Sequence, residues 1–155
     1  MQIIKRNIKG GRLVGEKLEK SIDAYTLLEV YQQMIAPKLK EIDVFLKTKE
    51  SDISVSEAAG LLDESEKNIL NIMARLHLTK IDKKSFIKIM INGRSPICGL
   101  LRRELDCGSP ILYSRKDIAY IYNLDLNKVN EVCDKLHIKE ITSYTMPKVF
   151  AHIPY

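Results

Sequence analysis

The sequence lacks the short motifs that mark the commonest enzyme classes. It has no glycine-rich phosphate loop, no nucleophile elbow built on Gly-x-Ser-x-Gly, and no His-Glu-x-x-His pair. These motifs serve nucleotide binding, serine hydrolysis and zinc-dependent proteolysis, respectively. Because none is present, we expect no catalytic residue, no cofactor and no enzyme activity.

Cysteines and long apolar runs are also scarce. The three cysteines, Cys98, Cys107 and Cys133, are odd in number and irregularly spaced, which is typical of reduced thiols in a cytoplasmic protein. Their spacing to His77 and His137 matches no common zinc-ligand pattern, so we expect no metal. No apolar run approaches about 18 residues, and the first residues lack the pattern of a secretion signal, so no membrane partner is expected.

The charge that is present is mildly basic and unevenly distributed. The net charge is +5, and residues 1–15 carry four cations and no acid. Residues 79–103 contain only Asp82 as an acid beside seven cations, Lys80, Lys83, Lys84, Lys88, Arg94, Arg102 and Arg103. Such clusters suit a polyanion such as nucleic acid, although a solvated surface is the alternative explanation.

Two stretches, ARLHLTKI at 74–81 and DKLHIKEI at 134–141, suggest an internal repeat with an offset of 60 residues. Over 54–90 and 114–150 there are six identities in 37 positions, and the functional positions correspond. Ser54 with Glu57, and Ser114 with Asp117, can each form a capping box at a helix start. Ser65 and Asp125 can cap a second helix. Apolar spacing then predicts helices over about 55–62 and 66–76, and over 115–122 and 126–136.

Further elements follow each predicted helix pair. Residues 78–81 and 138–141 resemble short β segments, and Ser85 and Thr145 can start a third helix. His77 and His137 fall at a helix end, where an imidazole can interact with the last carbonyls and the helix dipole. Between the copies, the Ser95-Pro96 pair predicts a connecting helix.

Residues 16–48 show apolar side chains at helical spacing, interrupted by Pro37. The proline should end one helix, start another or kink the pair. We expect this helical arm either to form a homodimer or to pack on the core of its own chain.

The segment SVSEAAGLLDESEKNILNIMARLHLTKI, residues 54–81, resembles the helix-turn-helix of the excisionase and MerR-type winged families. The copy SRKDIAYIYNLDLNKVNEVCDKLHIKEI resembles it less closely. In those families the second helix enters the major groove of DNA and a β wing touches the backbone, so the resemblance implies double-stranded DNA as a partner. It also implies base contacts from the second helix, and phosphate contacts come from exposed cations.

The candidate DNA-binding residues lie on the exposed positions of the second helices and in the basic segment. They are Lys67, Asn68, Asn71, Arg75, Lys80, Lys83, Lys84, Arg94, Arg102 and Arg103 around the first unit, and Asn127, Lys128 and Asn130 in the second. Charged side chains supply affinity, while Asn can pair with adenine.

The predicted fold is mainly α, with tandem winged-helix-like helix-turn-helix units and minor β hairpins behind an N-terminal helical arm. The expected segments are a basic arm (1–15), a helical arm (16–50), a first unit (51–93), a connecting helix (94–109) and a second unit (110–155). The expected function is transcriptional regulation or an architectural or excision role in a mobile element. The alternative is a protein-interaction module that uses the same scaffold without binding DNA.

Overall fold

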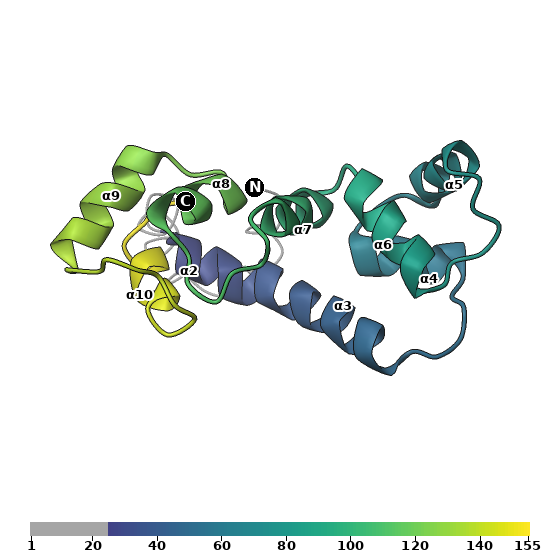
Figure 1. The fold of residues 1–155 in the computed structure, drawn as a ribbon, viewed down its shortest axis with the longest axis horizontal. Helices are drawn as coiled ribbons and strands as arrows, with labels where there is room; N and C mark the ends of the chain where they lie inside the picture. The colour runs from purple at the N-terminus through teal and green to yellow at the C-terminus, as the bar shows by residue number, and fades with distance from the viewer. Residues whose placement is uncertain (1–24) are drawn as a thin grey trace, which may run out of the picture.

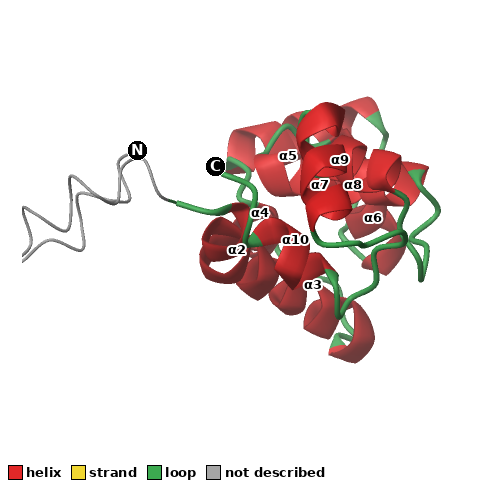
Figure 2. Ribbon diagram, turned by 90° about the vertical axis from the view of Figure 1, so that its left-hand side faces the viewer, coloured by secondary structure: helices red, strands yellow, loops and turns green. Residues whose placement is uncertain are grey.

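A computed structural model describes residues 25–155, and these residues are mainly helical, as predicted. The predicted basic arm at 1–15 and the start of the helical arm lie outside the described residues. Figure 1 shows an elongated molecule in which one long helical segment runs along two groups of shorter helices. Figure 2 shows helices and loops in the described part of the chain.

The long segment is built from three consecutive helical pieces, α2 (Leu27–Val30), η2 (Tyr31–Ile35) and α3 (Ala36–Thr48). Thr26 and Glu29 form a capping box at its start. The η2 piece is a π-helical turn, in which the Ala36 N–H reaches back to the Tyr31 carbonyl. Pro37 then occupies the first turn of α3, where its missing N–H costs little. The predicted interruption is therefore a π turn followed by a new α-helix.

The first unit, residues 53–92, contains α4 (Val55–Leu62), α5 (Glu66–Arg75) and α6 (Lys83–Asn92). Ser54 and Glu57 form the predicted capping box, and Ser65 caps α5 as predicted. The third helix does not start at Ser85 as predicted: Asp82 is its cap, and the Ser85 N–H donates to the Asp82 side chain. A single antiparallel β-bridge joins Ile53, before α4, to Ile81, after α5.

The second unit, residues 113–150, contains α8 (Arg115–Ile121), α9 (Leu126–Lys135) and α10 (Met146–Phe150). A shift of 60 residues carries the local features of the first unit onto this one. The bridge recurs between Tyr113 and Ile141, and the capping box recurs at Ser114. Asp63, which follows α4, has a left-handed backbone conformation, and Asn123, which follows α8, repeats it.

The predicted β hairpins are wrong. Within residues 25–155 the only β pairings are three isolated bridges, one of them between Thr26 and Pro154. The physical reason is chain length, because residues 76–82 are all that separates α5 from α6. Seven residues cannot hold two strands and a turn, so one residue crosses to pair with the segment before α4.

His77 and His137 end the second helix of each unit through their backbones. Both have a φ of 54°, in the left-handed region. The next N–H bonds to the carbonyl five residues back, at 2.9 Å for Leu78 and 2.8 Å for Ile138, as in a Schellman motif. Both imidazoles are exposed, and neither donates to or accepts from a described residue, so the predicted side-chain contact with the last carbonyls is not present.

Each unit has its own hydrophobic core, and the long helical segment contributes to both. Ile42 and Phe45 of α3 enter the first core, where the Phe45 and Phe86 rings meet edge to face at 4.6 Å. Leu27 of α2 enters the second core. The described part of the arm is thus packed on its own chain, one of the two outcomes expected.

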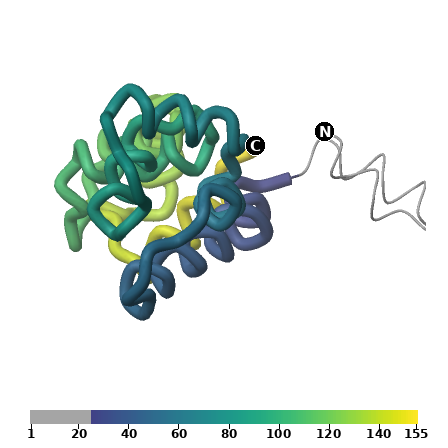
Figure 3. The backbone as a smooth tube through the Cα atoms, turned by 90° about the vertical axis from the view of Figure 1, so that its right-hand side faces the viewer, coloured from purple at the N-terminus to yellow at the C-terminus, as the bar shows by residue number. Residues whose placement is uncertain are grey.

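The connecting helix α7 (Pro96–Asp106) lies between the two units, with Ser95 as its N-cap as predicted. It packs against α6 on one side and α8 on the other. The C-terminal residues return to the start of the long segment, where the Tyr155 N–H donates to the Tyr25 carbonyl at 2.9 Å (Figure 3).

Candidate nucleic-acid interface

The exposed face of α5 is the first element of the candidate interface. Ile69 and Ile72 are buried in the core, which turns the opposite side of the helix to solvent. That side presents Lys67, Asn71 and Arg75, spaced four residues apart, together with Leu70 and Ala74. The face therefore carries two cations, one amide and no carboxylate beyond the first turn. One of the cations has a partner within the chain, because the Arg75 guanidinium donates to the Asn92 side-chain oxygen at 3.2 Å in an exposed hydrogen bond.

The matching face of α9 has different chemistry. The positions 60 residues later are occupied by Asn127, Asn130, Glu131, Asp134 and Lys135. Asp134 pairs with Arg115 at 2.7 Å, and Lys128 pairs with Glu131 at 3.5 Å. Two carboxylates on this face would repel phosphate, so the two units share local geometry but differ in surface charge.

The lysines of α6 form the second element of the candidate interface. Lys83, Lys84 and Lys88 are exposed and form no ion pair with any described residue. Asp82, the acid beside them, accepts a hydrogen bond from the Ser85 N–H as the helix cap. Lys80, by contrast, forms a long ion pair with Asp52, at 3.8 Å. Three cations are thus available to an anionic ligand.

Glu64 anchors the turn between α4 and α5 to the start of α7. Its carboxylate accepts hydrogen bonds from the backbone N–H groups of Arg94 and Ser95 and from the Asn68 amide. Partial burial by itself would raise the pKa of Glu64, but these hydrogen bonds outweigh burial and hold the pKa below its ordinary value. The Asn68 side chain is therefore already engaged.

The arginines of the basic segment also have partners inside the molecule. Arg102 donates to the Ile91 and Gly93 carbonyls at 2.7 and 3.1 Å, and Arg103 donates to the Ile121 carbonyl at 2.8 Å. Both guanidinium groups thereby satisfy carbonyls at or near the ends of α6 and α8. Arg94 is exposed, although its backbone N–H is bound by Glu64.

The overall charge of the described part is nearly balanced. Residues 25–155 contain 19 Lys and Arg against 17 Asp and Glu, so most of the excess positive charge belongs to residues 1–24. Any attraction for a polyanion by the helical part must therefore come from local clustering and not from net charge.

Several exposed apolar side chains lie in α7, in α8 and in the segment between them, and together they make a second candidate surface. It contains Leu105, Ile111, Leu112 and Tyr120, of which Ile111 is 90% exposed. The Tyr120 hydroxyl donates to Asp106 at 2.8 Å, which holds the ring beside the end of α7. Such a surface is a candidate for protein contact.

The three cysteines are free thiols, and two of them are buried. Cys98 and Cys133 are buried, and burial is the largest cause that raises the pKa of both thiols. Among residues 25–155 no cluster of three or more His, Cys, Asp or Glu side chains could hold a metal ion.

Sequence reasoning missed Glu64, whose backbone partners lie 30 and 31 residues away, because no local pattern signals such a contact.

None of the helices between residues 25 and 155 is both long enough and apolar enough to cross a bilayer. No protein-family model matches the chain, no curated protein matches its sequence, and no solved structure matches its fold.

Proposed function

We propose that the protein binds duplex DNA through its first unit, acting as a transcriptional regulator or as an architectural or excision factor of a mobile element. One observation carries the proposal. The exposed face of α5 bears Lys67, Asn71 and Arg75 without a neighbouring carboxylate beyond the first turn, whereas the matching face of α9 bears Glu131 and Asp134.

In this proposal α5 is the recognition helix of a helix-turn-helix. Arg75 and Lys67 suit guanine, and Asn71 suits adenine, because these side chains match the acceptor and donor pattern of those bases in the major groove. The exposed Leu70 and Ala74 between them suit a thymine methyl group. Lys83, Lys84 and Lys88 contribute phosphate contacts, which add affinity without sequence preference.

The remaining candidates have weaker claims. Arg102, Arg103 and Asn68 are held by partners within the chain, so they position the scaffold in this proposal. Arg75 also has a partner, the Asn92 side chain, and in this proposal it exchanges that partner for a base. The expected contacts from Asn127, Lys128 and Asn130 stay untested predictions. Residues 1–15, which carry four cations and no acid, would add affinity as a basic arm.

Fluorescence anisotropy of a mixed-sequence duplex with the full chain tests the proposal. Binding at 50 mM salt should weaken by on the order of 100-fold or more at 200 mM, because each neutralised phosphate releases counterions. Arg75→Gln should weaken binding by about tenfold, a loss of roughly 1–3 kcal/mol if Arg75 reads a base.

The matched control is Lys135→Gln, which alters the equivalent position of α9 and should leave binding unchanged. Absence of binding at 50 mM salt refutes the proposal. An equal loss of affinity in the two variants refutes the assignment of recognition to the first unit.

A second candidate function is a protein-interaction module, favoured by the exposed apolar surface of Leu105, Ile111, Leu112 and Tyr120. It predicts no salt-dependent DNA binding. It also predicts that Ile111→Ser abolishes capture of a protein partner without changing thermal stability, because the side chain of Ile111 is almost fully exposed.

A further inference from the structure

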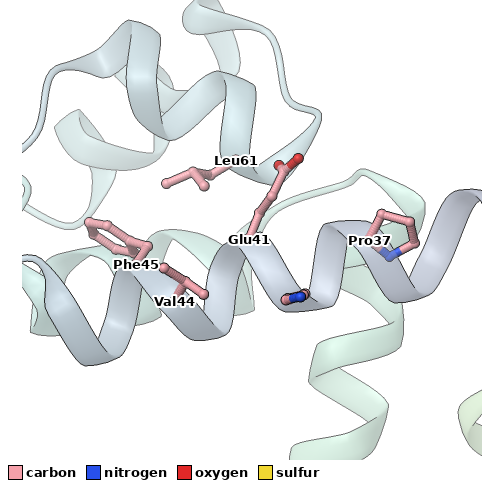
Figure 4. Close-up of a pocket in the computed structure, with 6 residues that line it drawn as sticks. Pro37, Glu41, Val44, Phe45 and Leu61 are labelled. Atoms are coloured by element: carbon pink, nitrogen blue, oxygen red, sulfur yellow. The ribbon is translucent and has the colours of Figure 1, made fainter.

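An open groove lies between α3 and α4, at the edge of the first core. Pro37, Val44 and Phe45 of α3 and Leu61 of α4 form its apolar part, and Lys40 and Glu41 add one charge of each sign. Figure 4 shows Leu61 directed from α4 toward Phe45 and Val44, with Glu41 farther along α3. The groove is therefore mainly apolar, with one cation beside one anion in its middle.

The strip follows a regular spacing along the long helical segment. Met34, Pro37, Glu41, Val44 and Thr48 recur every three or four residues, so they lie on one face of the helix. Two of the apolar side chains on this face are unusually exposed for large hydrophobic residues, Met34 at 50% and Val44 at 47%. This three-four spacing is the pattern by which two helices pack side by side.

The charges on the strip are self-complementary. Lys40 forms no ion pair with any described residue. Glu41 is held in place by Lys38, whose Nζ lies 3.3 Å from one Glu41 oxygen and 3.1 Å from Asp63. Lys38 also donates to the Gly60 carbonyl at 2.9 Å, which ties it to α4. One oxygen of Glu41 therefore remains free for a second cation.

We propose that a second copy of this chain docks in the groove, with the two α3 helices antiparallel about a two-fold axis near Lys40 and Glu41. Lys40 of each copy then faces Glu41 of the second copy, which gives two symmetric ion pairs. The same axis places Pro37 opposite Val44. A two-fold axis requires a surface that complements itself, and adjacent opposite charges flanked by apolar residues satisfy that requirement.

The proposed interface is small. One helix pair with its flanking side chains falls near or below about 1,200 Å² of total buried surface, which is the range of weak and transient complexes. We therefore expect a dissociation constant in the micromolar range or weaker. This dimer does not depend on DNA binding, and it is measured without DNA.

Sedimentation velocity of the full chain from low micromolar to near-millimolar concentration tests the proposal, with two single variants. Lys40→Glu places two anions opposite two anions, and Glu41→Lys places two cations opposite two cations. Each variant should dimerise at least tenfold more weakly than the natural chain, because like charges now face each other across the axis.

An equimolar mixture of the two variants provides the rescue. In a heterodimer the two acidic side chains of one variant face the two basic side chains of the other, so dimerisation should return to within about tenfold of the natural chain. Lys116→Glu on α8 changes the net charge equally but lies outside the groove, so it should leave dimerisation unchanged.

Three results would overturn the proposal. The natural chain could stay monomeric at the highest concentration, Lys40→Glu could dimerise as tightly as the natural chain, or the mixture could fail to recover. Circular dichroism of each variant checks that the fold is intact, which the exposure of residues 40 and 41 predicts.

Discussion

Glu64 offers the sharpest test of how the first unit is fixed to the rest of the molecule. Its carboxylate joins the turn after α4 to the start of α7 through two backbone N–H groups and the Asn68 amide. Glu64→Gln keeps the shape of the side chain but replaces one acceptor oxygen with an NH2 group. That group is a donor, so it would face a backbone N–H that also needs an acceptor.

The expected cost follows from the hydrogen bonds lost. A hydrogen bond to a charged group contributes about 1.5–3 kcal/mol, and Gln retains one oxygen that can accept some of the three donors. We therefore expect the free energy of unfolding to fall by about 2 kcal/mol. For a chain of this size that lowers the melting temperature by roughly 4–8 °C.

Urea denaturation at neutral pH measures this change, with Glu66→Gln as the matched control. Glu66 lies two residues further on, is exposed, and forms no ion pair with a described residue. Its substitution removes the same charge and should change stability by less than about 0.5 kcal/mol. Equal stability losses in the two variants would show that net charge matters and that the Glu64 contacts do not.

The pH dependence adds a second readout. Because the pKa of Glu64 in the folded state lies below its ordinary value near 4.5, its contribution is present above that value. The contribution is lost as the pH falls through the folded-state pKa. The stability gap between the natural chain and Glu64→Gln should therefore narrow as the solution is acidified below about pH 4.5. A gap that stayed constant would refute the reasoning.

Two further pairs of substitutions test backbone conformation and close packing by the same denaturation assay. His77→Gly and His137→Gly should each stabilise by about 0.5–1 kcal/mol, because the relief of left-handed strain exceeds the added flexibility of the unfolded chain. Destabilisation by either would instead mean that the imidazole contributes to the helix end. Gly93→Ala should destabilise by about 1–3 kcal/mol, because its Cβ would lie 2.4 Å from the Cys98 sulfur and 2.8 Å from a Glu64 oxygen. Gly60→Ala, where a Cβ meets open space inside a helix, should stabilise by about 0.5–1 kcal/mol. If Gly60→Ala were instead less stable than Gly93→Ala, the packing described would be contradicted.

Local signals in the sequence were sufficient to place the first two helices of each unit, whereas α6 starts after Asp82 and not at Ser85. The capping boxes at Ser54 and Ser114 start α4 and α8, and Ser95 followed by Pro96 starts α7. Each cap acts within three residues, so its partner can be identified without knowledge of the fold. Apolar spacing likewise identified Ile69 and Ile72 as the buried side of α5.

Predictions that depended on more distant partners fared less well. The β hairpins were inferred from apolar residues near 81 and 141, but Ile81 and Ile141 each pair with one residue before the first helix of their unit, and single bridges form instead. Arg102 and Arg103 were chosen for their charge, yet their guanidinium groups bind carbonyls 9–18 residues away. An exposed arginine and one that satisfies a helix end look the same in a sequence.

The sequence by itself determined where the first two helices of each unit and the connecting helix begin, because capping and apolar spacing act over a few neighbouring residues. Tertiary structure decided which polar side chains remain free, because Glu64 reaches the Ser95 N–H and Arg102 reaches the Ile91 carbonyl only when α4, α6 and α7 come together. It also decided that the described arm spans both cores. Apolar residues in a helix indicate that a side is buried, but they do not say against what.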